Sequence, residues 1–254
     1  MFVVFIIGTA GSGKSMLTSS YGNWLRTEKQ NVALANFDPG ALHLPYTPDL
    51  DVRDFISIEN IMDEYGLGPN GALIMAADLI ADMSEKLGEE LDLISPDIVL
   101  VDTPGQMELF AFRASGPYIA RELTREPKAI VYLFDSVFSA NPLNYVSNMF
   151  LSAAIHTRFF LPQIHVLSKC DLLPEKEVDN ILEWSESTAA LENAIQERSE
   201  DETRRLLSYN LMEAMHQLEL NFAMIPVSSK TNEGIIELSA FLERIFKAGE
   251  KITY

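Results

Sequence analysis

Short runs of apolar residues alternate along the chain with longer segments whose apolar residues recur at helical spacing. The short runs are bounded by Gly, Pro, Asp or Ser, as in strands that are buried on both faces of a parallel sheet. These predicted strands cover residues 2–7, 31–36, 97–102, 128–135, 163–167 and 223–227. Helices are predicted at residues 16–27, 57–65, 72–87, 141–160 and 233–248. The alternation predicts an α/β fold in which helices cover both faces of a mainly parallel central sheet.

Capping signals locate the ends of one predicted helix. Ser57 is a suitable N-cap for the helix that follows it, and Gly66 is a suitable stop. The tripeptide Gly68-Pro69-Asn70 separates this helix from the next one. Taken alone, that tripeptide is an ordinary turn with Asn70 as an N-cap.

Two segments differ from this core pattern. Residues 43–56 are rich in Pro and Asp, so they are predicted to be a loop or switch segment and not a core element. Residues 175–220 are charged and helical in character, with acidic clusters around Glu186 and at 197–202. They are predicted to form a solvated helical insertion.

Residues 8–15 form the pattern G-x-x-x-x-G-K-S directly after the first predicted strand and before a helix. The glycines let the backbone curl so that N–H groups face a triphosphate, and the helix start adds its positive dipole end. Lys14 supplies a cation for the β- and γ-phosphates, and the Ser15 hydroxyl is a ligand for Mg²⁺. We therefore predict a nucleotide site on a three-layer α/β sandwich of the P-loop NTPase type. The residues assigned to it are Gly8, Thr9, Ala10, Gly11, Ser12, Gly13, Lys14, Ser15 and Met16.

Acidic residues follow two further predicted strands. The carboxyl ends of parallel strands share one rim, where ligands bind, so Asp38 and Asp102 are expected there. Asp102 opens the pattern Asp-x-x-Gly-Gln, which predicts that it holds Mg²⁺ through the hydration shell of the ion. In the same pattern Gly105 offers an N–H to a γ-phosphate and Gln106 orients the attacking water. Asp38 is a candidate for Mg²⁺ or water contact, and a turn-forming Asp before Pro is an equal alternative.

A base-binding site is predicted from the last two strands. Ser168-Lys169-Cys170-Asp171 is similar to the guanine-reading pattern Asn-Lys-x-Asp, with Ser in place of Asn. Asp171 can accept hydrogen bonds from N1–H and the exocyclic amine of guanine, which adenine does not offer. The stem of Lys169 can lie over the base. One strand later, Ser228, Ser229 and Lys230 occupy the position of a loop that backs the guanine.

Composition narrows the class of protein. A length of 254 residues fits one large domain over residues 1–254 better than two domains. The 19 Lys and Arg residues face 37 Asp and Glu residues, and the net charge of -18 argues against binding nucleic acid or an anionic membrane over a broad face. The single cysteine, Cys170, indicates a reducing compartment.

The sequence also gives no sign of a membrane span, because no run approaches the roughly 18 apolar residues that a span needs. These features predict a soluble, cytoplasmic protein. Four scattered histidines and one cysteine give no sign of a zinc or nickel cluster.

The motifs occur in the order and strand positions of a GTPase. These motifs are Gly8–Ser15, Asp102–Gln106, Ser168–Asp171 and Ser228–Lys230. Gly68-Pro69-Asn70 is the tripeptide after which the GPN-loop GTPases are named, and the chain resembles that family over essentially its whole length. Its size is similar to that of the compact archaeal members. Helical insertions are expected at about 57–90, which carries the tripeptide, and at about 175–220.

The resemblance implies a homodimer that pairs through the nucleotide faces. Gly68, Pro69 and Asn70 would then act in the partner's site, while Asp38, Asp102 and Gln106 would complete the water and Mg²⁺ network within one subunit. The substrate and product would be GTP and GDP. Eukaryotic relatives are associated with the assembly and nuclear import of RNA polymerase, so polymerase machinery is a partner suggested by resemblance only. No arginine finger is identifiable; Arg53 and Arg113 are candidates only by their place in the sequence.

Three hypotheses of function follow from these motifs. The first is a homodimeric Mg²⁺-dependent GTPase in which catalysis is positioning and electrostatics. The second is a nucleotide-gated interaction module whose useful output is partner binding, with slow turnover. The third is a kinase that passes phosphate to an acceptor, and the guanine-binding motifs and Gln106 argue against it.

Overall fold

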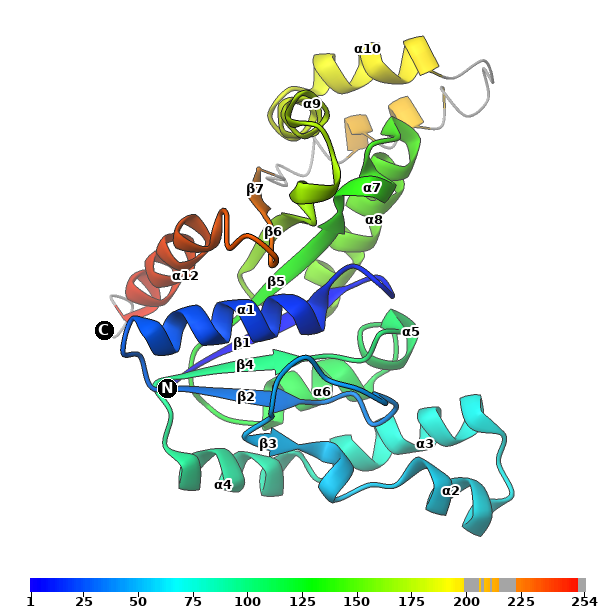
Figure 1. Cartoon of the computed structure of the whole chain (residues 1–254). Coiled ribbons are helices and arrows are strands. Elements are labelled where there is room, and N and C mark those ends of the chain that lie inside the picture. The colour runs from blue at the N-terminus through cyan, green and yellow to red at the C-terminus, as the bar shows by residue number, and fades with distance from the viewer. Residues whose placement is uncertain (199–205, 207, 211, 215–222, 251–254) are drawn as a thin grey trace.

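A computed structural model describes residues 1–198, 206, 208–210, 212–214 and 223–250 of the chain. Within these residues one seven-stranded sheet is present, its order is β3-β2-β4-β1-β5-β6-β7, and every pairing is parallel (Figure 1). The strands are β1 (Phe2–Gly8), β2 (Val32–Asn36), β3 (Leu50–Asp51), β4 (Ile98–Asp102), β5 (Lys128–Asp135), β6 (Gln163–Ser168) and β7 (Met224–Val227). The predicted α/β fold of the P-loop type is confirmed.

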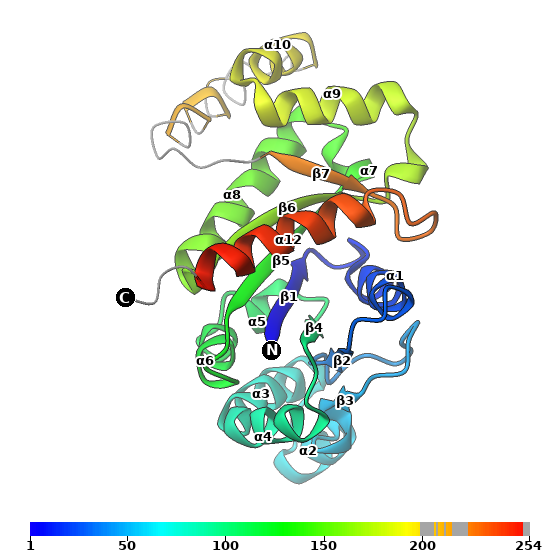
Figure 2. The same ribbon diagram turned by 90° about the vertical axis from the view of Figure 1, so that its left-hand side faces the viewer.

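Helices cover both faces of the sheet, and the three layers are visible in two orthogonal views (Figures 1 and 2). One face carries α1 (Lys14–Thr27) and α12 (Ile235–Glu250). The other carries α3 (Pro69–Asp82), α4 (Ser84–Ile94), α5 (Met107–Phe110), α6 (Ser115–Glu122) and α8 (Pro142–Phe159). The remaining elements are α2 (Ile58–Tyr65), α7 (Ser136–Ser139), α9 (Glu175–Glu186), α10 (Thr188–Arg198) and the 3₁₀ turns η1 (Val52–Asp54) and η2 (Cys170–Leu172).

Strand β1 explains why the apolar runs are unbroken. Val3, Phe5 and Ile7 point into the core beneath α3–α8, whereas Val4 and Ile6 point into the core beneath α1 and α12. All five side chains are buried, because successive residues of a strand face opposite sides and both sides are covered. Full burial of one such side chain contributes roughly 1.5–3 kcal/mol.

The predicted helix ends are correct where capping chemistry is strong. Ser57 accepts a hydrogen bond from the backbone N–H of Asn60 at the start of α2, and Gly66 ends that helix with φ 62°. Asn141 caps α8 in the same way, with Pro142 as its first residue.

Three predictions for residues 43–87 were wrong. The segment 43–56 contains an edge strand, β3, and the buried side chains Leu50 and Val52, because two apolar residues at a spacing of two are enough to reach the core from an edge. Asn70 is not an N-cap: Gly68 takes that position, and Pro69 is the first residue of α3. The predicted helix 72–87 is also interrupted at Met83, so α3 and α4 are separate.

The described part of the segment 175–220 is more than a solvated insertion. Helices α9 and α10 bury Ile181, Trp184, Leu191 and Ile195 in the core beneath α8. Most of residues 199–220, including much of the predicted acidic cluster at 197–202, lie outside the described residues. No helix among the residues that the structure describes is long and apolar enough to cross a membrane.

The parallel sheet brings the motifs together. The segments that follow β1, β2, β4, β6 and β7 all lie at the carboxyl edge, and each of them carries one predicted motif. The hairpin of α2 and α3 extends beyond this same edge (Figure 1).

Candidate functional site

The loop between β1 and α1 is curled by two glycines. Gly11 and Gly13 have φ of 76° and 96°, values that residues with a Cβ rarely adopt. Gly8 is needed for space, because a Cβ there would lie 2.6 Å from the Ser12 hydroxyl. The Ser12 hydroxyl is buried and has no hydrogen-bond partner within the described residues. This loop therefore has the curled backbone that a phosphate cradle needs.

Lys14 lies at the first position of α1 and is buried. Its ammonium donates hydrogen bonds to the carbonyl oxygens of Gly8 and Thr9, each at 3.0 Å. Burial lowers the pKa of Lys14, while the carboxylates of Asp102 and Asp38 oppose that shift. The cation is thus held inside the loop, next to two carboxylates.

Asp102 lies at the end of β4 and is almost fully buried. The hydroxyl of Tyr46 donates a hydrogen bond of 3.0 Å to Oδ2 of Asp102, and the Ser15 hydroxyl also bonds to this carboxylate. Its Oδ1 is buried with no partner in the described residues. Burial raises the pKa of Asp102 to about 6, although the Ser15 and Tyr46 hydroxyls and the Lys14 cation lower it.

Asp38 and Gly105 come together from loops that follow different strands. The backbone N–H of Gly105 donates to Oδ2 of Asp38 at 3.3 Å, and Oδ1 of Asp38 accepts from the N–H of Gly40 at 2.9 Å. The space beside the Cα of Gly105 is open: a Cβ added there would lie more than 4 Å from any heavy atom of the described residues outside 104–106. Gln106 is exposed at the start of α5. Asp38 therefore serves both as a turn residue and as a neighbour of the Asp-x-x-Gly-Gln segment.

A partly buried ion pair supports the loop that carries Tyr46. Arg53 donates through two nitrogens to Asp51 at 3.0 and 2.6 Å, and its third nitrogen donates to the Ala41 carbonyl at 2.7 Å. Burial alone would raise the pKa of Asp51, but the bonds from Arg53 and from Asn36 outweigh it and lower that pKa. Because these contacts occupy its guanidinium, Arg53 does not point to the phosphate loop.

Arg113 is the second arginine that the sequence suggested as a finger. Its guanidinium pairs with Asp78 of α3 at 2.8 Å, on the surface. Neither arginine therefore meets the phosphate loop within this chain.

The predicted base-binding segment is hydrogen-bonded to the loop between β1 and α1. The Ser168 hydroxyl donates to the carbonyl of Ser12 at 2.7 Å and lies 3.1 Å from the carbonyl of Phe134. The side chain of Lys169 runs beside Gly13, where an added Cβ would be 3.8 Å from its Cε. Its ammonium pairs with Asp135 at 2.7 Å. The serine thus performs the bracing role for which the pattern Asn-Lys-x-Asp uses asparagine.

Asp171 is exposed, and its carboxylate is oriented by the next strand. The buried Ser228 hydroxyl donates to Oδ1 of Asp171 at 2.7 Å. The same oxygen of Ser228 accepts the backbone N–H groups of Lys230 and Thr231 at 3.3 and 3.2 Å, so it also shapes the loop. Ser229 is half-buried and Lys230 is exposed beside it.

The predicted site residues fall into two groups. The structure brings the phosphate loop, Asp38, Asp102, Gly105 and the base-binding segments to one edge. Gly68, Pro69 and Asn70 lie apart, exposed at the turn between α2 and α3 (Figure 1).

Sequence reasoning missed Tyr46, Asp135 and the Arg53–Asp51 pair as parts of this edge. An aromatic residue between Pro45 and Pro48 in a polar loop was the only signal for Tyr46. Asp135 is the last residue of β5, and its ion pair with Lys169 gives it a supporting role that the apolar run of the strand did not indicate.

The chain is similar in sequence and in fold to proteins of one known family. The family model described as "conserved hypothetical ATP binding protein" matches residues 6–248. The chain is 35% identical to GPN-loop GTPase PAB0955 of Pyrococcus abyssi over 240 residues. This alignment covers 94% of each chain. The crystal structure of that archaeal GTPase in its apo form superposes with a TM-score of 0.85, at 33% identity, and covers 96% of this chain and 97% of that one.

Two eukaryotic relatives are longer than this chain. It is 29% identical over 238 residues to GPN-loop GTPase QQT2 of Arabidopsis thaliana, and 32% identical over 200 residues to GPN-loop GTPase 1 of Saccharomyces cerevisiae. The match covers 91% and 76% of this chain but only 60% and 50% of those relatives.

Proposed function

The chain belongs to the family of GPN-loop GTPases and hydrolyses GTP, and from this premise we propose that it works as a Mg²⁺-dependent homodimer with shared sites. In this proposal each subunit binds GTP at its own phosphate loop. Gly68, Pro69 and Asn70 of the other subunit complete the site. The observation that carries the proposal is the position of this tripeptide, which is exposed at the turn between α2 and α3, away from the loop between β1 and α1 (Figure 1).

The glycine of the tripeptide supports a close approach from outside. Gly68 has φ -73° and ψ 169°, which any residue adopts, and an added Cβ would meet nothing within 4 Å. Neither strain nor packing within the described part of this chain calls for glycine there. A second chain that packs closely on the loop would call for it, because a Cβ would then collide.

The donor set at Asp102 fits a magnesium ion. A buried carboxylate oxygen without a partner lies beside the Ser15 hydroxyl, and both are hard oxygen ligands. No group of three or more acidic, histidine or cysteine residues that could hold a metal occurs in the described residues, which suits an ion held jointly by substrate phosphates. Bound there, Mg²⁺ would neutralise charge that builds on the phosphates.

The other residues would position the substrate and the attacking water and stabilise charge on the phosphates. Lys14 and the backbone N–H groups of residues 8–15 would hold the phosphate oxygens, and the Gly105 N–H would bond to the γ-phosphate. Asp38 and Gln106, which flank Gly105, would orient the attacking water. Asp171, oriented by Ser228, would select guanine.

Complementation between subunits tests the shared site. Lys14→Ala removes a subunit's own phosphate contact, and Asn70→Ala removes the contact that it donates, so each variant alone should lose nearly all GTP turnover. After mixing and subunit exchange, half of the dimers are mixed, and each contains one site with both residues intact. Turnover should therefore recover to about a quarter of that of the unmodified protein.

A control in the same hairpin separates this result from a general effect on folding. Asn60 is exposed on α2, and Asn60→Ala should leave turnover unchanged. No recovery in the mixture, with subunit exchange demonstrated by a label, would refute the shared site and leave the assignment as a GTPase intact.

A further inference from the structure

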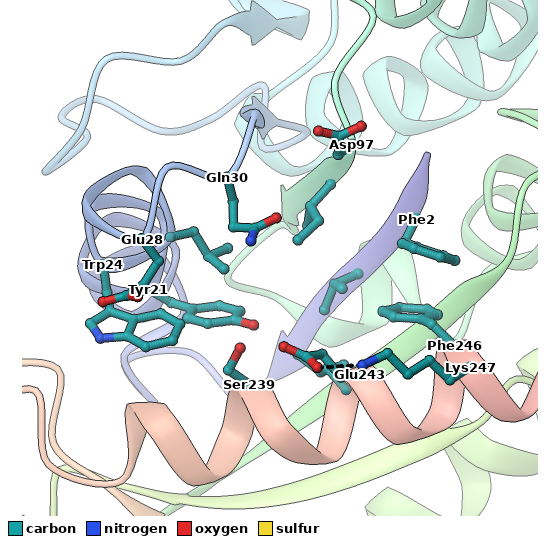
Figure 3. A pocket seen from close by; sticks show the side chains of 14 residues that line it. Phe2, Tyr21, Trp24, Glu28, Gln30, Asp97, Ser239, Glu243, Phe246 and Lys247 are labelled. Carbon is teal, nitrogen blue, oxygen red and sulfur yellow. Dashed lines mark hydrogen bonds and ion pairs between the residues drawn. The ribbon is translucent and has the colours of Figure 1, made fainter.

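A cavity lies at the end of the sheet opposite the nucleotide motifs. It has a volume of about 430 Å³ and lies between α1, α12 and the first residues of β1 and β4 (Figure 3). That volume is within the range of about 300–1,000 Å³ found for small-molecule sites. None of the residues assigned to GTP contributes to it.

Two aromatic pairs form opposite sides of this cavity (Figure 3). Tyr21 and Trp24 of α1 have ring centroids 6.1 Å apart, and Phe2 stacks on Phe246 of α12 at 4.4 Å. Apolar side chains, among them Leu242, line the space between them. Such surfaces suit an apolar or planar molecular body, and aromatic faces attract cations.

The charged groups of the lining are mainly acidic. Glu28, Asp97 and Glu243 contribute three carboxylates against the single cation of Lys247. Glu243 is occupied by its ion pair with Lys247 at 2.9 Å. The carboxylates of Glu28 and Asp97 have no ion-pair partner in the part of the chain that the structure describes. Burial raises the pKa of Tyr21 to about 12, so its phenol stays neutral and adds no negative charge.

We propose that this cavity binds a small organic cation, a molecule with a planar or aliphatic apolar body and one ammonium or guanidinium group. The body would lie between the two aromatic pairs, and the cation would approach one of the two carboxylates, Glu28 at the end of α1 or Asp97 just before β4. An anion would be repelled by the net charge of the lining, and a neutral molecule of the same shape would lose the electrostatic part of the attraction.

The two helices that enclose the cavity both begin at the nucleotide motifs. Helix α1 starts at Lys14, and α12 follows the loop that contains Ser228. A ligand held between their other ends would contact both helices.

Tryptophan fluorescence tests the proposal directly, because Trp24 lines the cavity. The only other tryptophan, Trp184, is buried beneath α8, and Trp184→Phe leaves Trp24 as the single reporter. The probe is phenethylamine, compared at constant ionic strength with its neutral and anionic analogues, 2-phenylethanol and phenylacetate. We expect a saturable change with phenethylamine, at least tenfold weaker binding of 2-phenylethanol, and none with phenylacetate. Calorimetric titration of the unmodified chain should give the same affinity.

Charge-matched variants locate the binding. Glu28→Gln combined with Asp97→Asn should weaken phenethylamine binding at least tenfold without changing the melting temperature. Glu89→Gln combined with Asp92→Asn, both exposed on α4, removes the same charge elsewhere and should have no effect. Equal responses to the three probes, no saturable signal, or equal losses in both double variants would overturn the proposal. Binding of an arginine-rich peptide without any response to phenethylamine would overturn it in favour of a protein partner.

Discussion

The hydroxyl of Tyr46 donates a hydrogen bond of 3.0 Å to Oδ2 of Asp102, across 56 positions of sequence. The other oxygen of this carboxylate, Oδ1, is buried without a partner in the described residues. Tyr46 therefore fixes the orientation of the carboxylate and leaves one oxygen free for a ligand. Residues that orient a metal ligand in this way commonly change metal affinity when they are replaced.

Tyr46→Phe should weaken Mg²⁺ binding to the nucleotide-bound protein by about tenfold, because the carboxylate of Asp102 loses its orienting donor. GDP affinity measured without Mg²⁺ should stay within about twofold. Both constants can be measured by titration with a fluorescent GDP analogue. Tyr65→Phe, an exposed tyrosine of α2, is the control. Tighter Mg²⁺ binding by Tyr46→Phe would contradict the orienting role and indicate competition with the ion.

Ser228→Ala should reduce the preference for GDP over ADP by about fivefold to tenfold, because Asp171 loses the hydroxyl that orients it. The measurement is the ratio of the two dissociation constants. Ser168→Ala is the comparison, since Ser168 bonds to the phosphate loop and not to Asp171. That variant should weaken GDP and ADP in parallel. A parallel loss in Ser228→Ala as well would show that Ser228 only shapes the loop.

Arg53→Ala should lower the free energy of unfolding by about 2 kcal/mol, because it leaves the nearly buried Asp51 without its cation. The figure is kept below the usual range for buried pairs because the Arg53 side chain is 32% exposed. Urea unfolding followed by circular dichroism measures the change. Arg113→Ala breaks the surface pair with Asp78 and should cost less than about 1 kcal/mol. Equal losses in the two variants would contradict the argument from burial.

His165 should make the protein less stable in mild acid. Burial lowers the pKa of His165 to about 4, with a smaller contribution from His156. Between pH 6.5 and 4 the unfolded chain therefore binds a proton at this position that the folded chain does not, so stability falls as the pH falls through that window. The loss from this residue should reach about 2 kcal/mol at pH 5.

The variant His165→Gln isolates this contribution. It keeps a polar group near Ser152 and Gln163, with which His165 makes hydrogen bonds of 2.7 and 3.1 Å, but it does not titrate. Urea unfolding at pH 8 and at pH 5 should show a smaller loss for the variant than for the unmodified chain. The same loss in both proteins would assign the acid sensitivity to other groups.

The motifs at this edge of the sheet could be predicted because the residues within each motif are close in sequence and their chemistry is local. The curl of residues 8–15 needs only glycines at Gly11 and Gly13, a preceding strand and a following helix. Likewise, Asp102 directly follows four consecutive apolar residues, Ile98–Val101, which predict a buried strand. The order of these motifs also identified the family, which the comparisons confirm.

The errors arose where several weak local signals overlap. Residues 43–56 contain many Pro and Asp residues, and the two buried side chains Leu50 and Val52 were too few to reveal β3. The break at Met83 could not be predicted because the helical spacing of apolar residues continues through it. In the structure the Ser84 hydroxyl donates a hydrogen bond to the Ala81 carbonyl, and this bond competes with the backbone hydrogen bonds of a continuous helix.

Sequence alone was sufficient for the α/β fold, the phosphate loop, the acidic strand ends and the family, since each is encoded by residue type within a short window. The tertiary structure alone determined that Tyr46 meets Asp102, that Ser228 orients Asp171 and that Ser168 reaches Ser12 across 156 positions. It also assembled the acidic and aromatic cavity between α1 and α12. These contacts depend on which strands are neighbours and on the paths of the loops, and no periodic pattern of apolar residues specifies either.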